Sequence, residues 1–108
     1  MIQKLDFGNI KEQAFALGNA ERLTIINHLR DHPRSVSDLL MELEITQSTL
    51  SHHLKILRKT GLVTGIRDGR HVYYAIRREG LSELINDLGR LSDQIPVSAQ
   101  ILPSEKED

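Results

Sequence analysis

The sequence contains no cysteine and no tryptophan, and aromatic residues make up only 4% of its 108 residues. The lack of cysteine excludes disulfides, thiolate metal sites and thiol redox sensing, and it agrees with a cytoplasmic protein. No apolar run approaches the ~18 residues that span a bilayer, and the first residues lack the basic-then-apolar layout of a signal peptide. We therefore expect a cytoplasmic protein with no membrane partner, whose core consists of leucine, isoleucine and valine.

Proline is also scarce, and two of the three prolines, Pro96 and Pro103, lie near the C-terminus. Pro96 lacks the amide N–H that a helix interior needs, so a helix before it has to end there. The residues after it combine proline, serine and charged side chains, which is typical of a poorly ordered end. Since a chain of this length is enough for one domain, we expect a single domain over residues 1–95 and a flexible tail over residues 96–108.

The net charge of −1 conceals a segregation of charge along the chain. Residues 46–78 carry seven basic side chains against one acid, a net charge of +6, whereas residues 1–45 sum to −2 and residues 79–108 to −5. A basic segment of this kind either binds a polyanion such as nucleic acid or forms an ordinary solvated face. Both interpretations are open on charge alone.

Apolar residues recur at helical spacing over the first half of the chain. Asn19 and Thr46 are suitable N-caps, and Pro33 and Gly61 are suitable stops. The spacing predicts four helices. The first covers residues 7–17, the second runs from the Asn19 cap to Pro33, the third opens at Ser35 or Ser37 and runs through Leu43, and the fourth runs from the Thr46 cap up to Gly61. Only Glu44-Ile45 separates the third helix from the fourth, and helices joined so tightly cross at a large angle, as in a helix-turn-helix.

From residue 62 the apolar period changes from helical to two. Residues 62–66 and 72–76 alternate, and the Asp68-Gly69 pair between them predicts a hairpin turn with positive φ at both positions. Residues 79–95 then return to helical spacing with one apolar stripe. The fold class that follows is mainly α with a β-hairpin wing, a winged helix-turn-helix of order α-α-α-α-β-β-α.

The fourth helix carries a polar face opposite its leucine stripe. At 100° per residue this face holds short hydrogen-bonding groups in its first half and bases further along, and no acid occurs from Thr46 to Ile66. A helix that enters the major groove of DNA requires this layout, whereas an ordinary surface helix normally mixes acids with bases. We expect Gln47, Ser48, Ser51 and His52 to read bases, and Lys55, Arg58 and Lys59 to bind phosphates. His53, at the edge of the leucine stripe, is expected to be packed rather than to read bases.

Two arginines, Arg67 and Arg70, flank the tip of the predicted hairpin. They form a compact cationic tip that can enter a minor groove, although exposed turn tips are often charged in any case. Within the second strand, alternation places Tyr74 inward and Tyr73 outward.

The chain resembles the ArsR/SmtB family of winged-helix repressors over residues 10–95. The similarity lies in LGNAERL from Leu17, TQSTLSHHLKIL from Thr46, GLV from Gly61 and the wing RDGRHVYY from Arg67. It implies a homodimer that is joined through the first and last helices, binds an imperfect palindrome in double-stranded DNA and represses transcription until an effector arrives. The apolar stripes of these two helices agree with such a dimer, and the expected interface is Ile10, Ala14, Leu17, Leu84, Leu88 and Leu91.

The effector does not carry over from the resemblance. Many family members bind thiophilic metals through cysteine, which is absent here, and others bind zinc on the last helix through a ligand set that includes histidine, whereas that helix offers only Glu79, Glu83, Asp87 and Asp93. His28 and His32 stand at a metal-binding i, i+4 spacing, but two ligands are too few for a structural zinc site. We expect no metal site and no cofactor, and the effector is unknown.

Other functional classes are a sensor that uses non-cysteine ligands, a winged-helix module that binds only protein, and an enzyme. The sequence has no glycine-rich phosphate loop, nucleophile elbow or His-Glu-x-x-His pattern. We therefore expect that the chain is not an enzyme.

Overall fold

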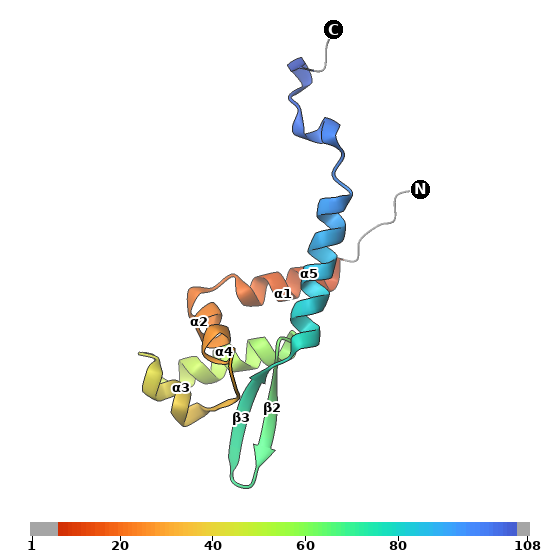
Figure 1. Cartoon of the computed structure of the whole chain (residues 1–108). Coiled ribbons are helices and arrows are strands. Elements are labelled where there is room, and N and C mark those ends of the chain that lie inside the picture. Colours follow the sequence, from red (N-terminus) through yellow and green to blue (C-terminus); the bar gives the residue numbers. More distant parts are fainter. Residues whose placement is uncertain (1–6, 106–108) are drawn as a thin grey trace.

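The computed structural model describes residues 7–105 and consists of a helical body, a β-sheet with a projecting hairpin, and a long last helix (Figure 1). The body contains α1 (Phe7–Leu17), α2 (Ala20–His28), α3 (Val36–Glu42) and α4 (Gln47–Lys59). The strands are β1 (Arg34–Ser35), β2 (Val63–Asp68) and β3 (His71–Ile76), and α5 (Arg78–Asp93) follows them. Two short 3₁₀ helices, Val97–Gln100 and Pro103–Glu105, extend beyond α5, away from the body. The predicted winged helix-turn-helix class is confirmed.

The sheet has one strand more than the sequence predicts. Its order is β1-β3-β2 and both pairings are antiparallel, with Arg34 opposite Tyr74 and Ser35 opposite Tyr73. A strand of two residues is too short for any apolar period, so only its pairing with β3 reveals it. Tyr74 is half-buried and packs against the core, as expected, and Tyr73 is half-buried as well.

The hairpin turn also differs from the prediction. Asp68 pairs with His71, so the two central residues of the turn are Gly69 and Arg70 rather than Asp68 and Gly69. Gly69 has a φ of 63°, and no non-glycine residue within 7–105 has a positive φ. Positive φ at the first central position alone is the pattern of a type II′ turn. The prediction of positive φ at Asp68 was wrong because the register keeps Asp68 in the strand.

The core is built from aliphatic side chains, as the composition predicts. Leu50, Leu54 and Leu57 of α4 are at most 2% exposed and form its centre. Burial of each such side chain contributes about 1.5–3 kcal/mol, so α4 is held firmly with its polar face outward. The remaining fully buried apolar side chains are Ala16, Ile25, Leu29, Leu39, Leu62 and Val63.

Two glycines bring the end of α4 against the start of α5. Gly61 has a φ of 75° and ends α4 in a Schellman motif, in which the amide of Gly61 donates to Arg58 O at 3.1 Å and that of Leu62 to Leu57 O at 3.0 Å. Gly80 of α5 is buried directly against the Gly61 carbonyl. This close approach sets the position of α5, which then packs across α1.

Within the described part of the chain, no helix combines the length and the apolar character that crossing a membrane requires.

Candidate nucleic-acid interface

The helix-turn-helix consists of α3 and α4, and each helix begins at a side-chain cap. Ser35 and Asp38 form a capping box at α3, with Ser35 Oγ accepting from the Asp38 amide and Asp38 Oδ2 accepting from the Ser35 amide, both at 3.1 Å. The hydrogen bond from the Ser35 backbone, followed by that from its side chain, lowers the pKa of the Asp38 carboxyl. Thr46 caps α4 by accepting from the Thr49 amide at 3.1 Å, as predicted. The Thr46 cap fixes where α4 begins and hence which residues make up its first turn.

All seven residues that the sequence predicts to contact DNA on α4 are exposed. They form one basic and polar surface, which we call the α4 face and which consists of Gln47, Ser48, Ser51, His52, Lys55, Arg58 and Lys59. The face holds no carboxylate, so nothing on it repels a phosphate backbone. Near its start, Ser48 Oγ lies 3.3 Å from Thr46 Oγ1, which restrains that hydroxyl.

The wing carries a second cationic surface. Arg67 and Arg70 are exposed at the tip of the β2–β3 hairpin, beside the exposed His71. In Figure 1 the hairpin extends past α4 and away from α1 and the C-terminal end of α5. The cationic tip therefore projects from the helical body of the protein.

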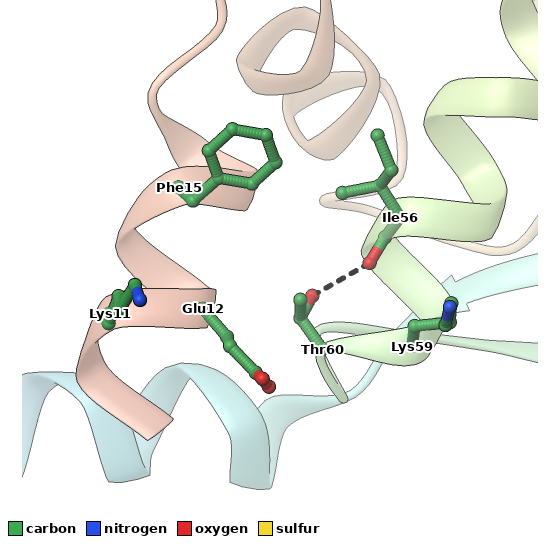
Figure 2. Close-up of a pocket in the computed structure, with 6 residues that line it drawn as sticks. All are labelled: Lys11, Glu12, Phe15, Ile56, Lys59 and Thr60. Carbon is green, nitrogen blue, oxygen red and sulfur yellow. Dashed lines mark hydrogen bonds between the residues drawn. The ribbon is translucent and has the colours of Figure 1, made fainter. Parts of the chain in front are cut away.

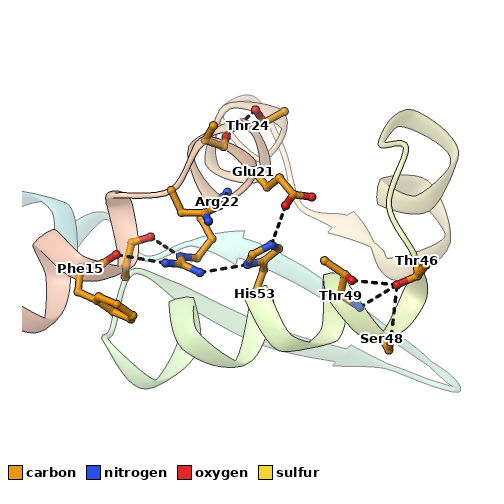
Figure 3. Close-up of polar contacts among 11 residues, drawn as sticks. Phe15, Glu21, Arg22, Thr24, Thr46, Ser48, Thr49 and His53 are labelled. Carbon is orange, nitrogen blue, oxygen red and sulfur yellow. Dashed lines mark hydrogen bonds and ion pairs between the residues drawn. The ribbon is translucent and has the colours of Figure 1, made fainter.

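A buried polar network, which the sequence reading did not single out, supports α4 from behind (Figure 3). Arg22 of α2 is only 6% exposed, and its Nη1 lies 3.1 Å from Nδ1 of His53, which is 5% exposed. An arginine can only donate, so His53 Nδ1 accepts, and its Nε2–H points to Glu21 Oε1 at 3.5 Å. The prediction that His53 is packed is confirmed.

The same Arg22 side chain also terminates α1. Its Nε donates to Ala16 O at 2.6 Å, which satisfies a carbonyl at the end of the helix, and its Nη2 donates at 3.2 Å to Phe15 O, which also accepts from the Gly18 amide. One guanidinium thus ties the end of α1 and the start of α2 to the middle of α4. The only sequence signal for this role was an arginine within the buried stripe of a helix.

The two histidines at i, i+4 spacing do not converge on a common point. His28 Nδ1 contacts Glu42 Oε2 at 2.7 Å, and Glu42 Oε1 accepts from Arg34 Nη1 at 2.8 Å. His32 is exposed and its Nδ1 lies 2.8 Å from Pro33 O. Among residues 7–105, no group of three or more histidine, cysteine or acidic side chains is arranged to hold a metal ion.

The residues expected at a dimer interface divide into two groups. Leu84 is 7% exposed, and Ile10 and Leu17 are half-buried, so these three side chains already pack within the chain. Ala14 is exposed, as are Leu88 at 46% and Leu91 at 41%. The sequence reading left out two further exposed apolar side chains of this region, Ile85 and Ile95. Together Ile85, Leu88, Leu91 and Ile95 form a stripe, the α5 stripe, that runs along the last helix and past its end.

Comparison with known proteins identifies the family. Residues 19–64 match the model of the family described as "Bacterial regulatory protein, arsR family". The chain is 38% identical to the HTH-type transcriptional regulator NmtR of Mycobacterium tuberculosis over 72 residues, which is 67% of this chain and 60% of NmtR. It is also 38% identical to the transcriptional activator HlyU of Vibrio cholerae over 76 residues, 70% of each protein.

Solved structures agree with this assignment. The structure of HlyU from Vibrio cholerae superimposes with a TM-score of 0.64 at 35% identity, covering 80% of this chain and 94% of HlyU. An ArsR-like regulator from Rhodococcus superimposes with a TM-score of 0.77, covering 82% of this chain and 83% of the other, and at 24% identity it supports the fold alone. The matched region spans little more than half the length of some curated relatives; in NmtR it covers 60% of the sequence. These are regulatory proteins, in agreement with the expectation that the chain is not an enzyme. The chain belongs to the ArsR family of bacterial regulatory proteins.

Proposed function

We propose that the protein is a cytoplasmic, homodimeric transcriptional regulator that binds a palindromic operator in double-stranded DNA and represses transcription. The observation that carries this proposal is the α4 face, a helix surface that projects only polar and basic side chains from a rigid aliphatic core. The family assignment supports it, since the relatives named above are transcriptional regulators.

Within this proposal, α4 lies in the major groove. Gln47, Ser48, Ser51 and His52, near its N-terminus, read base edges, because the first residues of a recognition helix lie deepest in the groove. Lys55, Arg58 and Lys59 bind phosphates, and Arg67 and Arg70 of the wing enter the adjacent minor groove. The buried Arg22–His53 contact holds the helix at a fixed depth relative to the body.

The proposed dimer joins α1 and α5 of two chains across a two-fold axis. The α5 stripe supplies its apolar surface, and the exposed Ala14 of α1 is a further proposed contact. A single module makes few base contacts, so two copies on one duplex supply the affinity that a palindrome requires. We assign DNA binding and dimerisation to residues 1–95, and we propose that the described residues 96–105 form a flexible tail. The predicted domain and tail also include residues 1–6 and 106–108, which lie outside the part of the chain that the structure describes.

Two substitutions on the α4 face separate phosphate binding from base reading. Lys55→Ala should weaken binding to every sequence and reduce the slope of log K against log salt by about 2 for a dimer, because two phosphate contacts are lost. His52→Ala should leave the salt slope unchanged and reduce discrimination against mismatched sites by ~1–3 kcal/mol. Binding is measured by fluorescence anisotropy on operator and mixed-sequence duplexes over a series of salt concentrations.

The matched control for this pair is Lys11→Ala, which removes an exposed lysine from α1 and should change neither quantity. If the two α4 variants lose the same affinity on every duplex, the division of roles is wrong. If the wild type binds DNA without steep salt dependence, the proposal fails and a protein-binding module becomes the better interpretation.

The dimer is tested by placing a charge in the α5 stripe. Leu88→Lys should shift the protein towards monomer, because two ammonium groups would be buried near the two-fold axis. Met41→Lys is the control, since Met41 is 86% exposed on α3, outside the proposed interface. Sedimentation equilibrium measures both variants. A monomeric wild type, or a Leu88→Lys variant as dimeric as Met41→Lys, would contradict the proposed interface.

A further inference from the structure

An open pocket lies between α1 and the C-terminal half of α4 (Figure 2). Its volume is about 450 Å³, within the range of sites that hold small organic molecules. None of the roles proposed above uses its apolar walls. The side chains that line this α1/α4 pocket are Lys11, Glu12, Phe15, Ile56, Lys59 and Thr60.

The walls of the pocket are apolar and preformed. Phe15 is 66% exposed although it is one of only two phenylalanines in the chain, and Ile56 lies half-buried across from it. The guanidinium carbon of the buried Arg22 lies 5.3 Å from the centroid of the Phe15 ring, a cation–π contact that restrains the ring. The hydroxyl of Thr60 is within hydrogen-bonding distance of Ile56 O and Leu57 O, so its proton is already engaged. An apolar group can therefore enter without displacing a protein–protein hydrogen bond.

The charges at the mouth of the pocket favour one anionic group. Lys11 and Lys59 stand on opposite sides of the pocket, with Glu12 between them (Figure 2). Within residues 7–105 neither lysine has an ion-pair partner in the structure. Two ammonium groups against one carboxylate leave an excess of one positive charge, which a single carboxylate on a ligand would neutralise.

We propose that the α1/α4 pocket binds a small amphipathic carboxylate, whose apolar body lies against Phe15 and Ile56 and whose carboxylate pairs with Lys59. The ligand would also weaken DNA binding, a part of the proposal that rests on the function proposed above. Lys59 belongs to the α4 face, so a carboxylate that pairs with it withdraws one phosphate contact per chain.

The binding site is tested on the protein without DNA. Isothermal titration calorimetry with decanoate should give saturable binding of one molecule per chain. The affinity for the uncharged 1-decanol should be lower by a factor of about ten or more. Phe15→Ser should lower the affinity for decanoate about tenfold by removing one apolar wall. Lys59→Gln should lower the affinity for decanoate but not for 1-decanol. Met41→Ser, a change at an exposed apolar side chain on α3, should have no effect.

Three results would overturn the site. They are the absence of saturable decanoate binding, equal binding by Phe15→Ser and wild type, and equal affinity for 1-decanol and decanoate. A fourth is a shift of Phe15→Ser from dimer to monomer in sedimentation, because Phe15 would then be covered by a second copy of the chain. Lys11→Gln, which leaves the apolar walls intact, keeps the test valid if Phe15→Ser proves unstable. Lys11→Gln should lower the affinity for decanoate and leave the affinity for 1-decanol unchanged.

The effect on DNA is measured separately. Decanoate should lower the DNA affinity of the wild type and leave that of Lys59→Gln unchanged. Saturable decanoate binding with unchanged DNA affinity would support the site and contradict the coupling. Decanoate binding by a protein that binds no DNA would support the site and contradict the proposed function, so the two failures are distinguishable.

Discussion

Replacing Gly80 with alanine is expected to destabilise the protein by about 3 kcal/mol, a large part of the stability of a small domain. A Cβ at Gly80 would lie 2.9 Å from the carbonyl carbon of Gly61, closer still to its oxygen, and 3.4 Å from Cα of Leu62. These are backbone atoms, which cannot rotate away as a side chain can. The new methyl group therefore has to push the start of α5 away from the turn that ends α4.

The control for this substitution lies on the same helix. A Cβ at Gly89 would have no neighbour within 4 Å, so Gly89→Ala should stabilise the protein by about 1 kcal/mol through helix propensity alone. Urea unfolding followed by circular dichroism, at equal protein concentrations, measures both variants. Equal stability of Gly80→Ala and wild type would mean that α5 does not depend on this close approach.

Arg22→Met is expected to cost about 3 kcal/mol of stability and to weaken DNA binding at every sequence. The substitution removes the donor for His53 Nδ1 and for the Ala16 carbonyl, and both acceptors stay buried. The Phe15 carbonyl keeps its hydrogen bond from the Gly18 amide. It also releases α4 from the end of α1, so the α4 face loses its fixed position relative to the wing. Urea unfolding measures the stability, and anisotropy with operator and mixed-sequence duplexes measures the binding.

A double-mutant cycle isolates the contribution of the histidine. His53→Leu alone leaves the Arg22 Nη1 donor buried without its acceptor, and the double variant removes both groups. The double variant should therefore be less destabilised than the sum of the single variants, with a remaining loss from the Ala16 carbonyl. Strict additivity would show that Arg22 and His53 are not coupled. Arg30→Met, at an exposed arginine that bonds only the adjacent Asp31 within residues 7–105, is the control and should be nearly neutral.

The sequence predicted correctly those elements in which apolar residues repeat several times at one spacing and a specific residue ends the element. The leucine stripe of α4, its Thr46 cap and its Gly61 stop each point to the same helix, and the structure has that helix. The exposure of the polar side chains on α4 followed from the same period, because burial of one stripe exposes the opposite one. Helical periodicity likewise placed His53 at the edge of the buried stripe, where it is found.

The errors arose where the pairing of strands outweighs local preference. Asp68-Gly69 is a good turn sequence, yet the pairing of Asp68 with His71 moves the turn by one residue. The β1 strand exists because β3 lies beside it, and these two strands lie far apart in the sequence, so no local pattern predicts their pairing.

The sequence by itself determined the class of the fold, the extents of α1 and α4 and the charge of the α4 face, whereas α2 ends at His28 and not just before Pro33 as predicted. Each of these depends on the spacing of residue types along one element, and that spacing is already present in the unfolded chain. The tertiary structure alone decided the triple role of Arg22, the close approach of Gly80 to Gly61 and the pocket between α1 and α4. These depend on distances between segments that are far apart in the chain, and such distances exist only when the aliphatic core brings the segments together.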